Sequence, residues 1–288
     1  MFENVKQGWA LGKQVRKLVF SDKGLILYPV LSAIVVFVEM LVIFLSFFLT
    51  SVTFTALAGG AYATAFYIVA LFLFYLVSTF TSTYILVAML LAFRAYASGH
   101  RISIGEAFAQ TRQYAKLILE WSIFFSVIIM VIRMIEQRLG ALGGAIFGLV
   151  AGMAVGVATI FVVPVIIDNR AGPIKAIKLS AEFFVKNFGK TFGGFVYSDL
   201  YNLMFIAAGI VLMIAGGAAA GISPILGIAV IAFGFILLVF GIIMNFLTIN
   251  VFKLILYEYT NGKGLPSGIS EEYIKNAVKK KRGLLQQQ

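Results

Sequence analysis

Six long apolar stretches, separated by short polar segments, dominate the pattern along the chain. They cover residues 24–50, 61–93, 117–135, 141–167, 191–215 and 224–251. A helix needs about 20 mainly apolar residues to cross the hydrocarbon core of a bilayer. The pattern therefore predicts an all-α, polytopic integral membrane protein with six transmembrane helices.

Three shorter segments alternate apolar and charged positions with a helical period, namely 2–19, 104–118 and 173–190. In the last of them one face carries the following apolar residues: Ile174, Ile177, Ala181, Phe184 and Phe188. Such segments are typical of amphipathic helices that lie in the membrane interface. They either position the next span as elbows, or bind anionic lipid headgroups or a peripheral partner.

Each amphipathic segment precedes two apolar spans, which indicates an internal repeat of one elbow and one helical hairpin. The units would run over residues 1–96, 97–170 and 171–258. Together they would form a single membrane domain, 1–258, followed by a basic cytoplasmic tail, 259–288.

Composition supports this interpretation, since 61% of the 288 residues are hydrophobic, 12% are charged and the mean hydropathy is +1.00. Soluble domains have about a quarter charged residues, so an ordinary soluble protein is excluded. The net charge is +11. All Lys and Arg residues except Arg133 and Arg138 fall on the side of the spans where the N-terminus lies. By the positive-inside rule, we expect a multi-pass protein of the cell membrane with both termini cytoplasmic, and no nucleic-acid partner.

The partners that this charge indicates are membrane lipids with anionic headgroups. The candidate headgroup or partner contacts are the basic residues of the amphipathic segments and their borders: Lys13, Arg16, Lys17, Arg112, Lys116, Lys175, Lys178, Lys186 and Lys190.

Residues 161–189 carry a recognisable pattern. An apolar span with Pro164 near its end leads to Asp168, a Gly172-Pro173 turn and an amphipathic helix that contains Ser180. This stretch resembles the signature of a broad group of uncharacterised polytopic membrane proteins, related to the membrane region of some glycerophosphodiester phosphodiesterases. The resemblance implies a helical membrane protein of unknown role. It brings no activity with it, because the phosphodiesterase catalytic domain has no counterpart in this chain.

Five glycines at intervals of four follow the third span: Gly140, Gly144, Gly148, Gly152 and Gly156. Small residues with this spacing let helix backbones approach closely in lipid, so the segment reads as a glycine zipper. This ridge would pack against another span of the same chain or against a second copy in a homo-oligomer, or it would line a pore. A second seam, Gly227, Gly234 and Gly241, has a spacing of seven, which is consistent with left-handed helix pairing.

Ionisable residues inside a span need a partner or a wet cavity. The candidate intramembrane polar residues are Glu39, Glu120, Arg133, Asp199 and Asn245. Glu39 and Arg133 lie at similar depths and could pair. Asp199 and Asn245 also share a level, with Tyr197, Tyr201 and Asn202 nearby, and we expect a polar cluster between the fifth and sixth spans. Such groups either hydrogen-bond helices together or line a substrate or proton pathway.

Catalytic chemistry is scarce in the sequence, which has no Cys and a single His, His100. We therefore expect no catalytic residues, no metal site, no cofactor and no enzyme activity. Two functions remain. The first is a non-catalytic membrane scaffold or lipid-interacting protein, with a homo-oligomer as one option; the second is a transporter or channel that uses the intramembrane polar residues.

Overall fold

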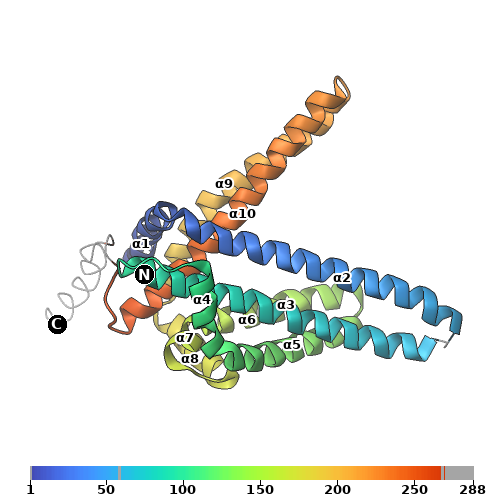
Figure 1. The fold of residues 1–288 in the computed structure, drawn as a ribbon, viewed down its shortest axis with the longest axis horizontal. Helices are drawn as coiled ribbons and strands as arrows, with labels where there is room; N and C mark the ends of the chain where they lie inside the picture. The colour runs from blue at the N-terminus through green and yellow to red at the C-terminus, as the bar shows by residue number, and fades with distance from the viewer. Residues whose placement is uncertain (1, 58–59, 267–268, 270–288) are drawn as a thin grey trace. The chain divides into compact units, whose positions relative to one another are not determined.

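The computed structural model describes residues 2–57, 60–266 and 269, and this part of the chain is helical, with no strand (Figure 1). The α-helices are α1 Phe2–Ser21, α2 Leu27–Leu57, α3 Gly60–Ala97, α4 Ile104–Thr111, α5 Ala115–Arg138, α6 Gly140–Thr159, α7 Val162–Asn169, α8 Pro173–Lys186, α9 Phe188–Ala220 and α10 Pro224–Thr260. Two short 3₁₀ turns, η1 Lys23–Ile26 and η2 Arg112–Tyr114, lead into α2 and α5.

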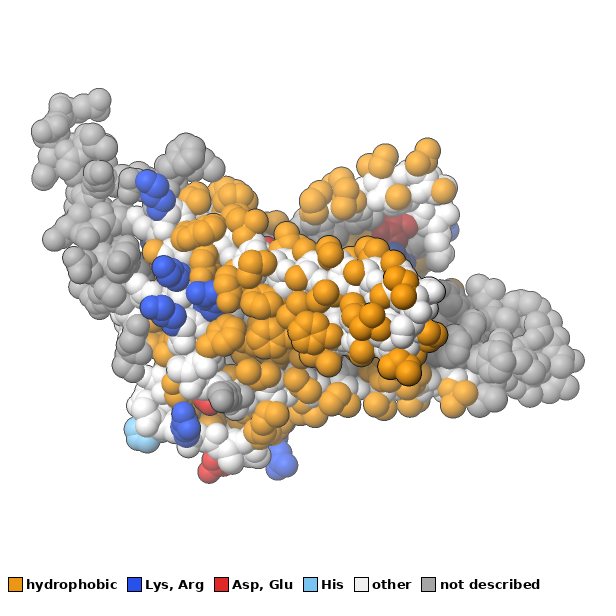
Figure 2. Space-filling model, turned by 90° about the horizontal axis from the view of Figure 1, so that it is seen from above, with side chains coloured by type: hydrophobic (Ala, Val, Ile, Leu, Met, Phe, Trp, Pro, Cys, Tyr) orange, Lys and Arg blue, Asp and Glu red, His pale blue; other side chains and the backbone are white. Residues whose placement is uncertain are grey.

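Six stretches of the described helices are long and apolar enough to cross a membrane. They are Gly24–Ile43, Ile68–Ala97, Ile104–Arg138, Gly140–Asn169, Phe188–Ala220 and Pro224–Thr260. Among the described residues on the face seen in Figure 2, hydrophobic side chains far outnumber charged ones. The predicted all-α class and the six long apolar helices are confirmed, and they suggest a multi-pass membrane protein.

The chain divides into two compact units. The first contains α1, η1, α9, α10 and the end of α3, and the second contains most of α2 and α3 together with α4 to α8. The units are therefore assembled from separated parts of the chain, whereas the sequence repeat groups consecutive residues. The three-unit repeat and the single domain stay predictions, and most of the predicted basic tail lies outside the described residues.

In the first unit, α9 and α10 form an antiparallel hairpin whose contact runs along glycines. A methyl group added to Gly209 would lie 2.7 Å from the carbonyl oxygen of Gly234, and one added to Gly234 would lie 2.7 Å from that of Gly209. Gly227 and Gly241 meet α9 in the same way, at Ala220 and beside Phe205 and Ile206. Since no side chain separates them, the two backbones approach closely over several turns.

Helix α1 packs against the first turns of α9 in the same unit. A side chain at Gly8 would collide with the carbonyl oxygen of Lys190, and one at Gly193 would collide with that of Val5. Gly194, which follows Gly193, leaves room for the Phe252 ring of α10, which a side chain at this position would overlap. Three glycines therefore allow α1 to lie directly on the α9–α10 hairpin.

In the second unit, α8 folds back beside the start of α7. The hydroxyl of Ser180 accepts a hydrogen bond from the backbone N–H of Phe161 at 2.9 Å, and the Phe161 and Phe183 rings meet edge to face at 4.6 Å. Pro164 has no N–H to continue the helical ladder, which is consistent with the break between α6 and α7.

The buried face of α8 differs from the predicted apolar face. Ala176, Ser180 and Phe183 are buried, whereas Ile174 is 74% exposed. This face of α8 turns inward because Ser180 binds the backbone N–H of Phe161, which would otherwise be unpaired, and Phe183 packs on the Phe161 ring. The apolar stripe is left facing outward.

Candidate functional site

The predicted polar cluster between α9 and α10 exists, but its members differ from the expected ones. Asn245 accepts hydrogen bonds at its Oδ1 from Asn202 Nδ2 at 3.2 Å and from Ser198 Oγ at 3.4 Å. Asn202 also donates to the backbone oxygen of Ser198 at 2.8 Å. Ser198 and Asn202 are buried, whereas Asp199 is exposed and does not join them. The cluster therefore links two helices through neutral groups.

Asp199 interacts electrostatically with Lys253 of α10. The ammonium of Lys253 donates to Asn250 Oδ1 at 3.4 Å and lies 5.7 Å from the centre of the Phe195 ring. Lys253 was not among the residues that the sequence pattern singled out. Asn245 and Lys253 are eight residues apart, which is about two helical turns, and this spacing could have placed them on one face of α10.

Arg16, a predicted headgroup contact, is held by aromatic rings of α9. Its guanidinium lies 3.8 Å from the centre of the Tyr201 ring and 5.7 Å from that of Tyr197. Trp9 meets Tyr197 edge to face at 4.9 Å. The Arg16 side chain therefore helps to hold α1 on α9.

The other basic residues of α1 lie on its opposite side. Lys6, Lys13 and Lys17 are exposed, so this helix presents a cationic stripe away from its contact with α9. Lys190, at the start of α9, is half-buried beside Gly8.

Glu39 does not pair with Arg133, contrary to the pairing suggested by their depth. Its two carboxylate oxygens accept hydrogen bonds from α3, from Ser78 Oγ at 2.9 Å and from Thr81 Oγ1 at 2.6 Å. Hydroxyls one turn apart on a neighbouring helix satisfy both oxygens at short range. Depth along separate helices predicts the level of a side chain and not the direction in which it points.

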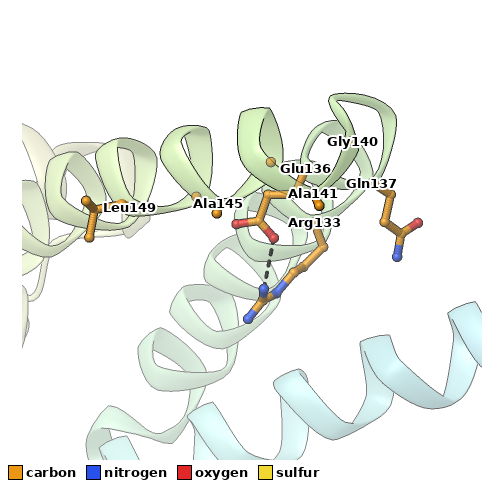
Figure 3. A pocket seen from close by; sticks show the side chains of 9 residues that line it. Arg133, Glu136, Gln137, Gly140, Ala141, Ala145 and Leu149 are labelled. Carbon is orange, nitrogen blue, oxygen red and sulfur yellow. Dashed lines mark hydrogen bonds and ion pairs between the residues drawn. The ribbon is translucent and has the colours of Figure 1, made fainter.

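Arg133 instead pairs within its own helix. Its Nη1 donates to Glu136 Oε2 at 2.8 Å, and both residues line a groove of about 720 Å³ between α5 and α6 (Figure 3). Glu136 was not predicted as a site residue. Its position three residues after Arg133, on the same helix face, was the available signal.

The five-glycine ridge of α6 is used only in part. Gly144 and Gly148 lie against Glu136 of α5, whereas open space surrounds added methyl groups at Gly152 and Gly156 within the described part of the chain. Gly140 has a φ of +70° and begins α6 after the turn. Contact between the open end of the ridge and a second copy of the chain stays a prediction.

The remaining predicted basic residues lie at the surface of the second unit or at its border. Lys175, Lys178 and Lys186 of α8 are exposed, as are Arg112 and Lys116 near the start of α5.

Helix α4 begins with a capping box, in which Ser103 and Glu106 exchange hydrogen bonds.

Glu120, the last of the predicted intramembrane residues, is half-buried. Its carboxylate lies beside Gly172 in the turn before α8, where an added methyl group would be 3.8 Å from Glu120 Oε2. In the described part of the chain, no hydrogen bond joins Glu120 to Glu39, Arg133 or Asn245.

Comparison with known proteins gives one match. Residues 64–265 match the model of a family described as a family of unknown function, DUF6159. No curated protein and no solved structure matches the chain. The match names no activity and no glycerophosphodiester phosphodiesterase.

Proposed function

The chain belongs to DUF6159, a family of unknown function, and we propose that this member is a non-catalytic, lipid-interacting membrane protein. Its interfacial helices α8 and α1 would bind anionic headgroups at the cytoplasmic surface of the cell membrane. The surface of α8 is the observation that carries the proposal.

Three stripes run along α8. The first is buried against α7, and the second consists of apolar side chains that point outward, with both Ile174 and Val185 74% exposed. The third consists of the exposed charged residues Lys175, Lys178, Glu182 and Lys186. An apolar stripe that no described residue covers, next to cations, suits a helix whose apolar side enters the acyl region while its lysines remain at the headgroups.

Helix α1 adds a second cationic surface, formed by its exposed lysines. Its other side rests on α9 through Gly8 and Arg16. A helix fixed in this way would present its charges at a constant place, so that lipid binding requires little ordering of the protein.

Two of the intramembrane polar groups, Glu39 and Asn245, favour this function over transport. Glu39 is satisfied by hydroxyls of one neighbouring helix, and Asn245 by amide and hydroxyl donors of another. Groups that satisfy one another between adjacent helices act as interhelical contacts. A pathway would instead need polar groups that are open to a substrate.

The test uses the full chain, purified in detergent and titrated with phosphatidylglycerol or phosphatidylcholine, with native mass spectrometry as the readout. Each lysine near an anionic surface contributes about 1 kcal/mol, which is about fivefold in affinity. Substituting Gln for Lys175, Lys178 and Lys186 together should therefore weaken phosphatidylglycerol binding by about a hundredfold.

Glu182→Gln, on the same charged stripe, is the matched control and should not weaken binding. Unchanged phosphatidylglycerol affinity in the triple lysine variant would contradict the proposed function.

A further inference from the structure

The groove between α5 and α6 presents one positive and one negative group side by side. The Arg133 side chain is 56% exposed and the Glu136 side chain 18% exposed, and one hydrogen bond of 2.8 Å joins them. Tyr75 of α3 also contacts the guanidinium. A guanidinium has five N–H donors, so these two contacts leave other donors facing the groove.

In the described part of the chain, only one of the two oxygens of the Glu136 carboxylate accepts a hydrogen bond. Glu136 Oε2 accepts from Arg133, whereas no hydrogen bond reaches Oε1 from the described residues. Figure 3 shows the Glu136 side chain lying along α6, with the Arg133 guanidinium below it. The groove therefore offers donors for an anionic oxygen next to an acceptor for an N–H group.

The glycines of α6 create the space for this pair. A methyl group on Gly148 would overlap Glu136 Oε1, and one on Gly144 would lie 2.5 Å from the Glu136 carbonyl oxygen. Alanine at Gly148 would thus push the carboxylate out of its place. One turn further on, a methyl group added to Gly152 would have no atom of the described residues within 4 Å, so alanine fits there without displacing a side chain.

We propose that this groove binds the headgroup of a phospholipid that carries both a phosphate and a primary ammonium, as in phosphatidylethanolamine. The Arg133 fork would bind phosphate oxygens, and Glu136 Oε1 would accept an N–H of the ammonium. A volume of about 720 Å³ lies in the range of small-molecule sites.

The surroundings of the groove select a lipid over a free solute. Leu149 lines it, and Leu142, seven residues earlier on the same line of α6, is 83% exposed. These apolar side chains provide a surface for acyl chains beside the headgroup. Helix α6 begins a stretch that is long and apolar enough to cross a membrane, so acyl chains would run parallel to it.

This site goes beyond the proposed function and has a different order of preference. The lysines of α8 would favour a net negative lipid, whereas Glu136 would repel one and would pair with an ammonium. A choline headgroup has no N–H to donate to Glu136. The groove therefore binds phosphatidylethanolamine more tightly than phosphatidylcholine or phosphatidylglycerol.

Native mass spectrometry of the full chain in detergent, titrated with these three lipids, tests the order. We expect Glu136→Gln to weaken phosphatidylethanolamine binding about tenfold, since the ammonium loses its anionic partner and keeps only a neutral amide acceptor, while phosphatidylcholine binding is unchanged. Arg133→Gln should weaken both. Gly148→Ala should resemble Glu136→Gln, and Gly152→Ala is the matched control that retains wild-type affinity.

Two results would overturn the assignment. One is equal affinity of the wild-type chain for phosphatidylethanolamine and phosphatidylcholine, a comparison that does not depend on how any variant folds. The other is binding of free O-phosphoethanolamine as tight as that of the lipid, which would make the groove a solute site. The triple lysine substitution on α8 should leave phosphatidylethanolamine binding intact, so this proposal and the proposed function fail separately.

Discussion

The Arg16 guanidinium on α1 lies over the ring of Tyr201 on α9, 3.8 Å from the ring centre. This contact joins α1 to the α9–α10 hairpin. Arg16 therefore does not belong to the exposed basic stripe of α1, although the sequence pattern grouped it with Lys13 and Lys17.

Replacing Arg16 by Ala should loosen α1 from α9. A cation–π contact contributes about 1 kcal/mol, and the side-chain stem would also lose its packing against the rings. Proteolysis within α1 should become faster, and the fluorescence of Trp9, which touches Tyr197, should change. Lys17→Ala, at an exposed position of the same helix, is the control; equal effects of the two substitutions would show that Arg16 does not hold α1.

The cluster at Asn245 should act as an interhelical contact. Asn245→Leu keeps the side chain close to its size and removes the acceptor for Asn202 and Ser198, so the free energy of unfolding should fall by about 1 kcal/mol. Asp199→Asn, whose side chain lies outside the cluster and loses only its electrostatic attraction to Lys253, should lower it less in a denaturant titration in mixed micelles. Solute flux into liposomes that the wild type supports and Asp199→Asn abolishes would instead favour the transporter function.

Gly234→Ala should destabilise the α9–α10 hairpin. The added methyl group would lie 2.7 Å from the Gly209 carbonyl oxygen, so that the helices must separate, with a loss of about 1–3 kcal/mol. Gly217→Ala on α9, where the described residues leave open space, should not lower stability. Thermal unfolding of both variants measures the difference, and the prediction fails if their midpoints coincide.

Gln7 of α1 should be a position where a substitution increases stability. Its side-chain nitrogen and oxygen are buried and have no hydrogen-bond partner in the described part of the chain. Gln7→Met removes an unsatisfied amide while retaining a similar volume, and we expect a gain of about 1–3 kcal/mol. Lys6→Met at the neighbouring exposed position controls for added hydrophobicity. Lower stability of Gln7→Met would mean that the amide is satisfied in the membrane-bound protein.

The sequence by itself determined the all-α class and the six long apolar helices, because length and hydropathy are local properties. Within the predicted amphipathic segment 104–118, Ala107, Thr111 and Tyr114 are buried, whereas Ile104 is exposed. The seven-residue spacing of Gly227, Gly234 and Gly241 likewise placed these residues on one line, and that line meets α9.

Only the tertiary structure decided which polar groups meet. Glu39 binds Ser78 and Thr81 because α3 presents these hydroxyls to it, and α8 turns Ser180 inward to bind the N–H of Phe161. Helical periodicity tells which residues share a face, but the rotation of each helix depends on its neighbours. In a protein whose apolar side chains can meet either lipid or protein, the pattern cannot distinguish the two surroundings, and the specific hydrogen bonds and close glycine contacts set the rotation.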